Sequence, residues 1–155
     1  MTERILIIGI GNAYRCDDGA GLAAADELIR RRVPGADILR ACGDGTSLIE
    51  AWQGRDRVVL IDATFSGATP GTIHRIEASA EPLPVSFSHH STHSVNLAEA
   101  VELARVLHRL PERLTVVGIE GEDFRSGTGL SPAVRSAVDQ VVQLIEDRRC
   151  NSTAS

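Results

Sequence analysis

Carboxylates and an imidazole stand in three separate segments of the chain, at positions where they could do chemistry. Asp17 and Asp18 occupy a turn after the first apolar run, Asp62 ends a second apolar run, and His93 lies at the mouth of a helix. Two carboxylates and one imidazole are enough to hold a divalent metal ion and leave coordination positions open for a reacting group. The oxygen and nitrogen donors suit nickel or zinc among other metals, so the sequence predicts a metal site without choosing the metal.

Each of these residues also has a plain structural explanation. An aspartate at a helix start commonly caps it, which explains one of Asp17 and Asp18 but not both. Asp62 could simply bond the amides of the next turn. A loop that also carries His89 and His90 could be solvated, with no function. The expected location favours a site, because Asp62 and the two neighbouring aspartates emerge at one sheet edge if their strands are adjacent.

Other kinds of site are disfavoured by specific residues. The turn after the first apolar run begins like a dinucleotide-binding fingerprint, but Tyr14 stands where its third glycine belongs, and the two aspartates would repel a pyrophosphate. No G-x-S-x-G or HExxH motif occurs. Cys16, Cys42 and Cys150 form an odd set without CxxC spacing, and we rank them as weaker candidates.

The apolar pattern predicts alternating strands and helices. Strands are expected over residues 4–10, 36–42, 57–62, 71–77 and 114–119, helices over 18–32, 47–52, 94–110 and 132–147, and a polar loop over 82–92. Such alternation is typical of a parallel sheet covered on both faces, with 71–77 as an edge strand. The sequence therefore predicts one α/β domain over residues 1–148, and residues 149–155 as a disordered tail.

Composition narrows the function classes. The chain has 155 residues, a formal net charge of -5, and 16 basic residues that are all arginine, so routes that need a catalytic or phosphate-binding lysine are excluded. The acidic charge disfavours nucleic acid as a partner, and no membrane-length apolar run or signal peptide is visible. We expect a cytoplasmic protein, since the odd cysteine set suits a reducing compartment.

Five segments together resemble the hydrogenase maturation proteases, the endopeptidases that trim the C-terminal extension from the large-subunit precursor of nickel-iron hydrogenases. In chain order they read GIGNAYRCDDGAG, VVLIDA, STHSVNLAEAVELA, TVVGIEGE and GTGLSPAVRSAVDQVV. The match extends over nearly the whole chain.

The resemblance implies a three-layer α/β/α fold, with a mostly parallel twisted sheet of about five strands and an antiparallel edge strand. It implies that Asp18, Asp62 and His93 are the metal ligands, with Asp18 standing where well-known members carry glutamate. The metal would be nickel already loaded into the precursor, with zinc as another divalent candidate, and Asp17 is our candidate for a supporting acid or base. We expect a monomeric nickel-dependent peptidase. The alternative is a non-catalytic nickel-binding chaperone or checkpoint protein that uses the same three ligands.

Overall fold

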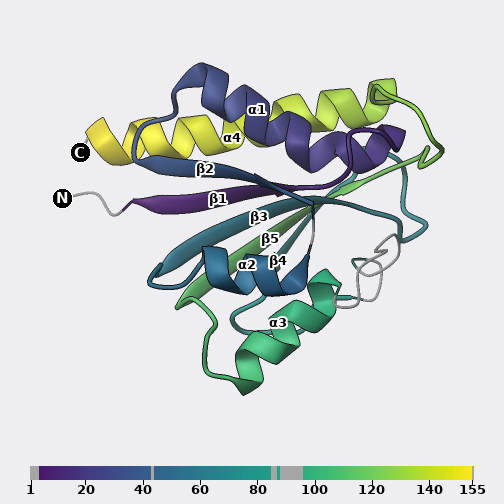
Figure 1. Cartoon of the computed structure of the whole chain (residues 1–155). Coiled ribbons are helices and arrows are strands. Elements are labelled where there is room, and N and C mark those ends of the chain that lie inside the picture. The colour runs from purple at the N-terminus through teal and green to yellow at the C-terminus, as the bar shows by residue number, and fades with distance from the viewer. Residues whose placement is uncertain (1–3, 43, 85–86, 88–95, 155) are drawn as a thin grey trace.

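The computed structural model describes residues 4–42, 44–84, 87 and 96–154. Its centre is a five-stranded twisted sheet with the strand order β2-β1-β3-β5-β4 (Figure 1). The strands are β1 (Ile5–Ile10), β2 (Ala36–Ala41), β3 (Arg57–Thr64), β4 (Ile73–Glu77) and β5 (Arg113–Glu120). Only β4 runs antiparallel to its neighbour, and it lies at an edge. The predicted sheet, with its antiparallel edge strand, is confirmed.

Helices cover both faces of this sheet and give the expected three layers. They are the short 3-10 helix η1 (Cys16–Gly19) and the α-helices α1 (Ala20–Arg31), α2 (Gly45–Ala51), α3 (Leu97–Val106) and α4 (Pro132–Ala154). Helices α1 and α4 lie on one face, and α2 and α3 lie on the other (Figure 1). Among the described residues, no helix combines the length and the apolar character that a membrane crossing needs.

The protein has two hydrophobic cores, one on each face of the sheet, because successive side chains of a buried strand point to opposite faces. In β1 every residue is buried, so its side chains serve both faces in turn. Leu6 and Ile8 pack in the core beneath α2 and α3, while Ile5 and Ile7 pack in the core beneath α1 and α4. The chain's one tryptophan, Trp52, belongs to the first core and satisfies its indole N–H by donating to the Arg109 carbonyl at 2.9 Å.

The order of the strands reverses between β1 and β3. From β1 the chain crosses to β2 on one side and later returns to β3 on the other. In open α/β sheets, the crevice for a ligand lies at the carboxyl ends of the strands at such a reversal. These two strands are neighbours, which is the condition under which Asp62 is expected at the same sheet edge as Asp17 and Asp18: Leu6 pairs with Val58 and Gly9 with Ile61 in parallel register.

Helix α1 lies unusually close to the sheet at this reversal. A Cβ atom added to Gly21 would collide with the carbonyl oxygens of Ile61 and Ile10, and one added to Gly9 would collide with the Gly21 carbonyl oxygen. Glycine at both positions thus lets the first turn of α1 lie directly on the strand backbones. The residues just before α1 are thereby brought close to the ends of β1 and β3.

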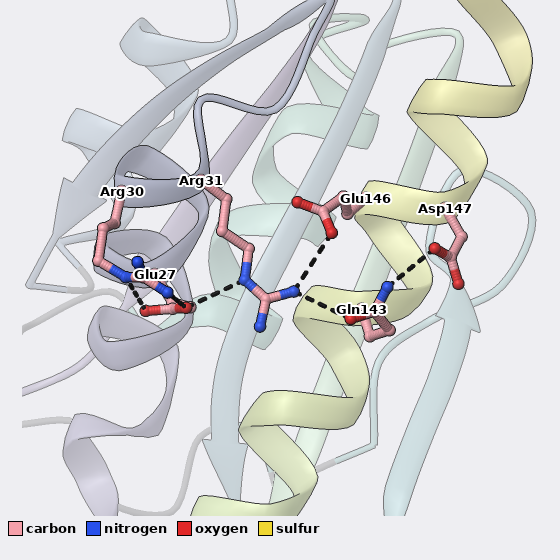
Figure 2. Close-up of polar contacts among 6 residues, drawn as sticks. All are labelled: Glu27, Arg30, Arg31, Gln143, Glu146 and Asp147. Carbon is pink, nitrogen blue, oxygen red and sulfur yellow. Dashed lines mark hydrogen bonds and ion pairs between the residues drawn. The ribbon is translucent and has the colours of Figure 1, made fainter. Parts of the chain in front are cut away.

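Charged side chains join α1 to α4 on the outer surface (Figure 2). Glu27 accepts hydrogen bonds from both Arg30 and Arg31 of its own helix. Arg31 also reaches across to α4, donating to Gln143 at 3.1 Å and pairing with Glu146 at 3.4 Å. The planar guanidinium fork can serve two helices at once because it presents several donors in one plane.

Helix α4 runs to Ala154, well beyond residue 147, where its pattern predicts an end, and through the segment expected to be a disordered tail. Arg149 explains part of the extension. Its side chain is buried and donates to the carbonyl oxygens of Pro34 and Gly35, at 3.3 and 3.0 Å. These contacts anchor the last turns of the helix to the turn before β2, a link that the apolar pattern does not encode.

Candidate functional site

Asp62 lies inside β3, two residues before the strand ends, rather than at its exit. Leu60, two residues earlier on the same strand face, is buried in the core beneath α2 and α3. Asp62 is the next residue of β3 on this face and lies just beyond the apolar residues of that core. Its Oδ1 accepts a hydrogen bond from the Ala63 N–H at 2.8 Å. Burial, together with the nearby charge of Asp18, raises the pKa of Asp62 well above its ordinary value, and the hydrogen bond from Ala63 opposes the shift only in part.

Asp18 stands in η1, directly before the first turn of α1. Its side chain is half-buried, and burial raises its pKa to about 6, although the charge of Arg15 and a hydrogen bond from the Asn12 backbone oppose this rise. The structure thus brings Asp18 close enough to Asp62 for its charge to raise the pKa of Asp62. Two carboxylates that lose solvation and lack a full counter-charge form a site that favours a cation.

Asp17, the neighbour of Asp18, is fully buried and points into a different network. Its Oδ2 accepts from the backbone N–H groups of Glu122 and Asp123, both at 2.9 Å, and from the Ser131 hydroxyl, also at 2.9 Å. Its Oδ1 accepts from the Ser131 N–H at 2.8 Å. The carboxylate therefore ties η1 to the segment between β5 and α4.

The capping explanation is wrong for both aspartates. Helix α1 has Gly19 at its N-cap, and no side chain caps either α1 or η1. The four hydrogen bonds to Asp17 instead show its structural role, which is to join two segments that are distant in the sequence. Its part as an acid or base stays a prediction, and the observed geometry is that of a positioning residue.

A further buried carboxylate, Glu120, was not among the sequence candidates. It ends β5 opposite Thr64 of β3, and it accepts from the Ser66 N–H at 2.8 Å and the Ser66 hydroxyl at 2.6 Å. His74 of β4 lies against it, with Nε2 3.1 Å from Oε1. Burial alone would raise the pKa of Glu120, but the hydrogen bonds from Ser66 and His74 outweigh it and hold the pKa below its ordinary value.

The signal that could have found Glu120 is the one that found Asp62: a carboxylate at the end of an apolar strand. Its contacts fix the segment after β3 and the edge strand β4 to the end of β5. Glu120 and Asp17 therefore both fix neighbouring segments to the carboxyl end of β5.

Thr64 presents a buried hydroxyl without a partner. It lies on the same face of β3 as Asp62, and within the part of the chain that the structure describes its Oγ1 makes no hydrogen bond. The side chain is 1% exposed. A buried hydroxyl without a hydrogen-bond partner lowers the free energy of unfolding, so the fold should gain stability if this hydroxyl were removed.

The third predicted ligand, His93, lies outside the described residues, as do His89 and His90. Among the residues that are described, no group of three or more His, Cys, Asp or Glu side chains could hold a metal ion. The structure therefore brings together two of the three predicted ligands and leaves the third as a prediction. Asp44, another aspartate that follows a strand, is the N-cap of α2, where its carboxylate accepts from the Thr46 N–H at 3.3 Å.

The chain is similar in sequence to known hydrogenase maturation proteins. Its sequence is 31% identical over 147 residues to the hydrogenase expression/formation protein HupD of Bradyrhizobium diazoefficiens, an alignment that covers 93% of this chain and 77% of the relative. It is 27% identical over 146 residues to the hydrogenase 2 maturation protease of Escherichia coli, covering 92% and 88%.

The fold agrees with these relatives. The solution structure of an endopeptidase from Escherichia coli superimposes with a TM-score of 0.77 and 27% identity, covering 92% of this chain and 89% of that one. The family model of the hydrogenase maturation proteases, HycI, matches residues 24–148, which is most of the chain. Sequence, fold and family model agree, and the chain belongs to the hydrogenase maturation protease family, a family of peptidases.

Proposed function

We propose that this protein is an endopeptidase that removes the C-terminal extension of a nickel-iron hydrogenase large-subunit precursor after nickel has been inserted. The precursor would bring the nickel, and Asp18, Asp62 and His93 would hold it. The proposal is supported by family membership and, most directly, by the acidic pair near the carboxyl ends of the neighbouring strands β1 and β3. This pair lacks the counter-charge that a bound cation would supply.

The donor chemistry suits this reading. Asp18 and Asp62 offer carboxylate oxygens from two elements whose spacing is fixed by backbone packing, and a histidine would add the nitrogen that nickel accepts readily. Precursor nickel held there supplies Lewis acidity and fixes the scissile segment relative to the protein. Burial raises the pKa values of both carboxylates, so cation binding at this pair should strengthen as pH rises.

The direct test is intact-mass measurement. Nickel-loaded large-subunit precursor, incubated with the protein, should lose the mass of its C-terminal extension, whereas nickel-free precursor should stay uncut. Asp62→Asn should fail to cut. Asp139→Asn, at an exposed position on α4, is the matched control and should cut normally. Cleavage of nickel-free precursor at the same rate would overturn the proposed nickel check.

The same measurement separates the alternative, a non-catalytic nickel-binding chaperone or checkpoint protein. This alternative draws support from Asp17, whose oxygens already accept four hydrogen bonds and offer little to a substrate proton. A precursor that co-elutes with the protein on gel filtration, yet keeps its full mass, would favour the chaperone.

The resting state can be tested without precursor. If the site waits for nickel carried by the substrate, protein dialysed against a chelator should contain far less than one metal ion per chain by elemental analysis. Metal retained at one ion per chain would show instead that the protein carries a resident ion.

A further inference from the structure

The face of the sheet beneath α4 is incompletely covered near its edge. Val59 of β3 and Val117 of β5 are partly exposed on this face, whereas Val58 and Val116, their neighbours on the opposite face, are buried. Leu144 of α4 is 54% exposed above them. Apolar side chains of the sheet and the helix therefore face a gap that the chain itself does not fill.

This gap is a cavity of about 280 Å³ between α4 and strands β3, β5 and β4. Val59, Val117 and Ile73 contribute apolar surface from the sheet, and Leu144 and Ile145 contribute it from the helix. Its volume is near the lower end of the range of roughly 300–1,000 Å³ that small-molecule pockets occupy. Such a size suits a small ligand better than a folded partner.

Four arginines also line the cavity: Arg57, Arg75, Arg148 and Arg149. None of its lining residues, all drawn from the described part of the chain, is acidic. The whole chain carries a net charge of -5 with 21 acidic residues, whereas the residues that line this cavity carry a net positive charge.

Two of these guanidinium groups are available to a ligand. Within the described ranges, neither the Arg57 nor the Arg148 side chain makes a hydrogen bond or ion pair with another residue. Arg75, by contrast, pairs with Glu77 at 3.1 Å. Arginine favours carboxylate and sulfonate groups because its planar donors can form two parallel hydrogen bonds with them.

We infer that the cavity between α4 and the β3–β5–β4 part of the sheet binds a small amphipathic anion, meaning a carboxylate or sulfonate attached to an apolar body. The apolar body lies between the sheet valines and the Leu144 side of α4, and the anionic group meets Arg57 and Arg148. The site is separate from the acidic pair. It adjoins Arg57 and Thr115 near the amino ends of β3 and β5, whereas Asp62 lies towards the carboxyl end of β3.

Binding can be measured with anilinonaphthalenesulfonate, a fluorescent amphipathic anion, and with octanoate as a competitor. The wild-type protein should bind one probe per chain, and octanoate should displace it while uncharged octanol does not. The double variant Arg57→Gln/Arg148→Gln should weaken binding by roughly tenfold or more, because hydrogen bonds between charged groups are lost. Leu144→Asp should also weaken probe binding. Leu144 is 54% exposed, so this variant should fold normally.

Two matched controls locate the site. Arg135→Gln removes an exposed arginine elsewhere on α4 and should leave binding unchanged. Asp62→Asn should also bind the probe normally, because the two sites are separate. Thermal unfolding of each variant checks that it is folded.

Three outcomes would overturn the inference. Equal displacement by octanol and octanoate would show that charge plays no part. Unchanged binding in both the double variant and Leu144→Asp would place the probe elsewhere. Flotation of the wild type with phosphatidylglycerol vesicles, lost in the double variant, would replace a free anion with a lipid surface.

Discussion

Ser131 donates two hydrogen bonds to the Asp17 carboxylate, from its backbone N–H at 2.8 Å and from its hydroxyl at 2.9 Å. The two residues are 114 positions apart in the chain. The contact joins η1, which follows the first strand, to the start of α4, which follows the last parallel strand. The segment that carries Asp18 is therefore anchored to a segment that is distant in the sequence, the start of the C-terminal helix α4.

Asp17→Asn should destabilise the protein strongly. An amide keeps one acceptor oxygen but places an N–H₂ group against donors, so buried N–H groups lose their partners at a cost of about 2–4 kcal/mol. Urea unfolding, compared with the exposed control Asp139→Asn, measures this loss. A variant with wild-type stability and no cleavage would instead identify Asp17 as an acid or base of the reaction.

Asp18→Asn should stabilise the protein at neutral pH. The pKa of Asp18 is raised from 3.8 to about 6, so the folded state holds this proton more tightly than the unfolded state, and wild-type stability falls as pH rises between these values. Asparagine carries no such penalty. The gain should be on the order of 2 kcal/mol above pH 7 and should shrink towards pH 4.

Asp62→Asn should show the same trend, because the pKa of Asp62 is raised as well. Denaturant unfolding at several pH values checks both variants, and cleavage assays should show that both are inactive. A less stable Asp18→Asn variant at pH 8 would contradict the reasoning. Asp18→Glu, which keeps a carboxylate and adds one methylene group, should retain cleavage.

Thr64→Val should also stabilise the fold. Valine replaces the buried hydroxyl, which has no partner among the described residues, with a methyl group of similar size, and the relief should amount to about 1 kcal/mol. Thr64→Ser is the matched variant, since it keeps the hydroxyl and loses the methyl group, and it should be less stable than wild type. A loss of stability in Thr64→Val would mean that the hydroxyl has a partner in solution.

His93→Ala should abolish cleavage of nickel-loaded precursor, because one of the three proposed ligands is lost. His89→Ala and His90→Ala, changes close to His93 in the sequence, should cleave at close to the wild-type rate. Intact-mass measurements over time give the comparison. Equal loss of activity in all three variants would indicate that the segment as a whole matters, rather than one imidazole.

The sequence is sufficient to predict the sheet and, on the condition that β1 and β3 are neighbours, the emergence of Asp18 and Asp62 at one sheet edge. These depend on local periodicity and on the general rule that parallel strands present their carboxyl ends at one edge. The signal was strong because β1 and β3 are nearly continuous apolar runs that end beside carboxylates.

The role of Asp17 could not be predicted in the same way. Its partners, Glu122, Asp123 and Ser131, follow β5 and approach η1 only after the whole sheet has formed. The last turns of α4 present the same difficulty, because Arg149 finds its acceptors in the turn before β2. Contacts between distant segments leave no periodic trace in the sequence.

The close approach of α1 to the sheet has a consequence for the chemistry. Gly21 lies directly on the backbone of Ile61, the residue before Asp62, and Asp18 stands three residues before Gly21. The separation of the two charges is therefore set by contact between main chains, with no side chain as an adjustable spacer. A methyl group at Gly21 would collide with the carbonyl oxygens of Ile61 and Ile10, so the separation of Asp18 and Asp62 depends on a residue that carries no functional group.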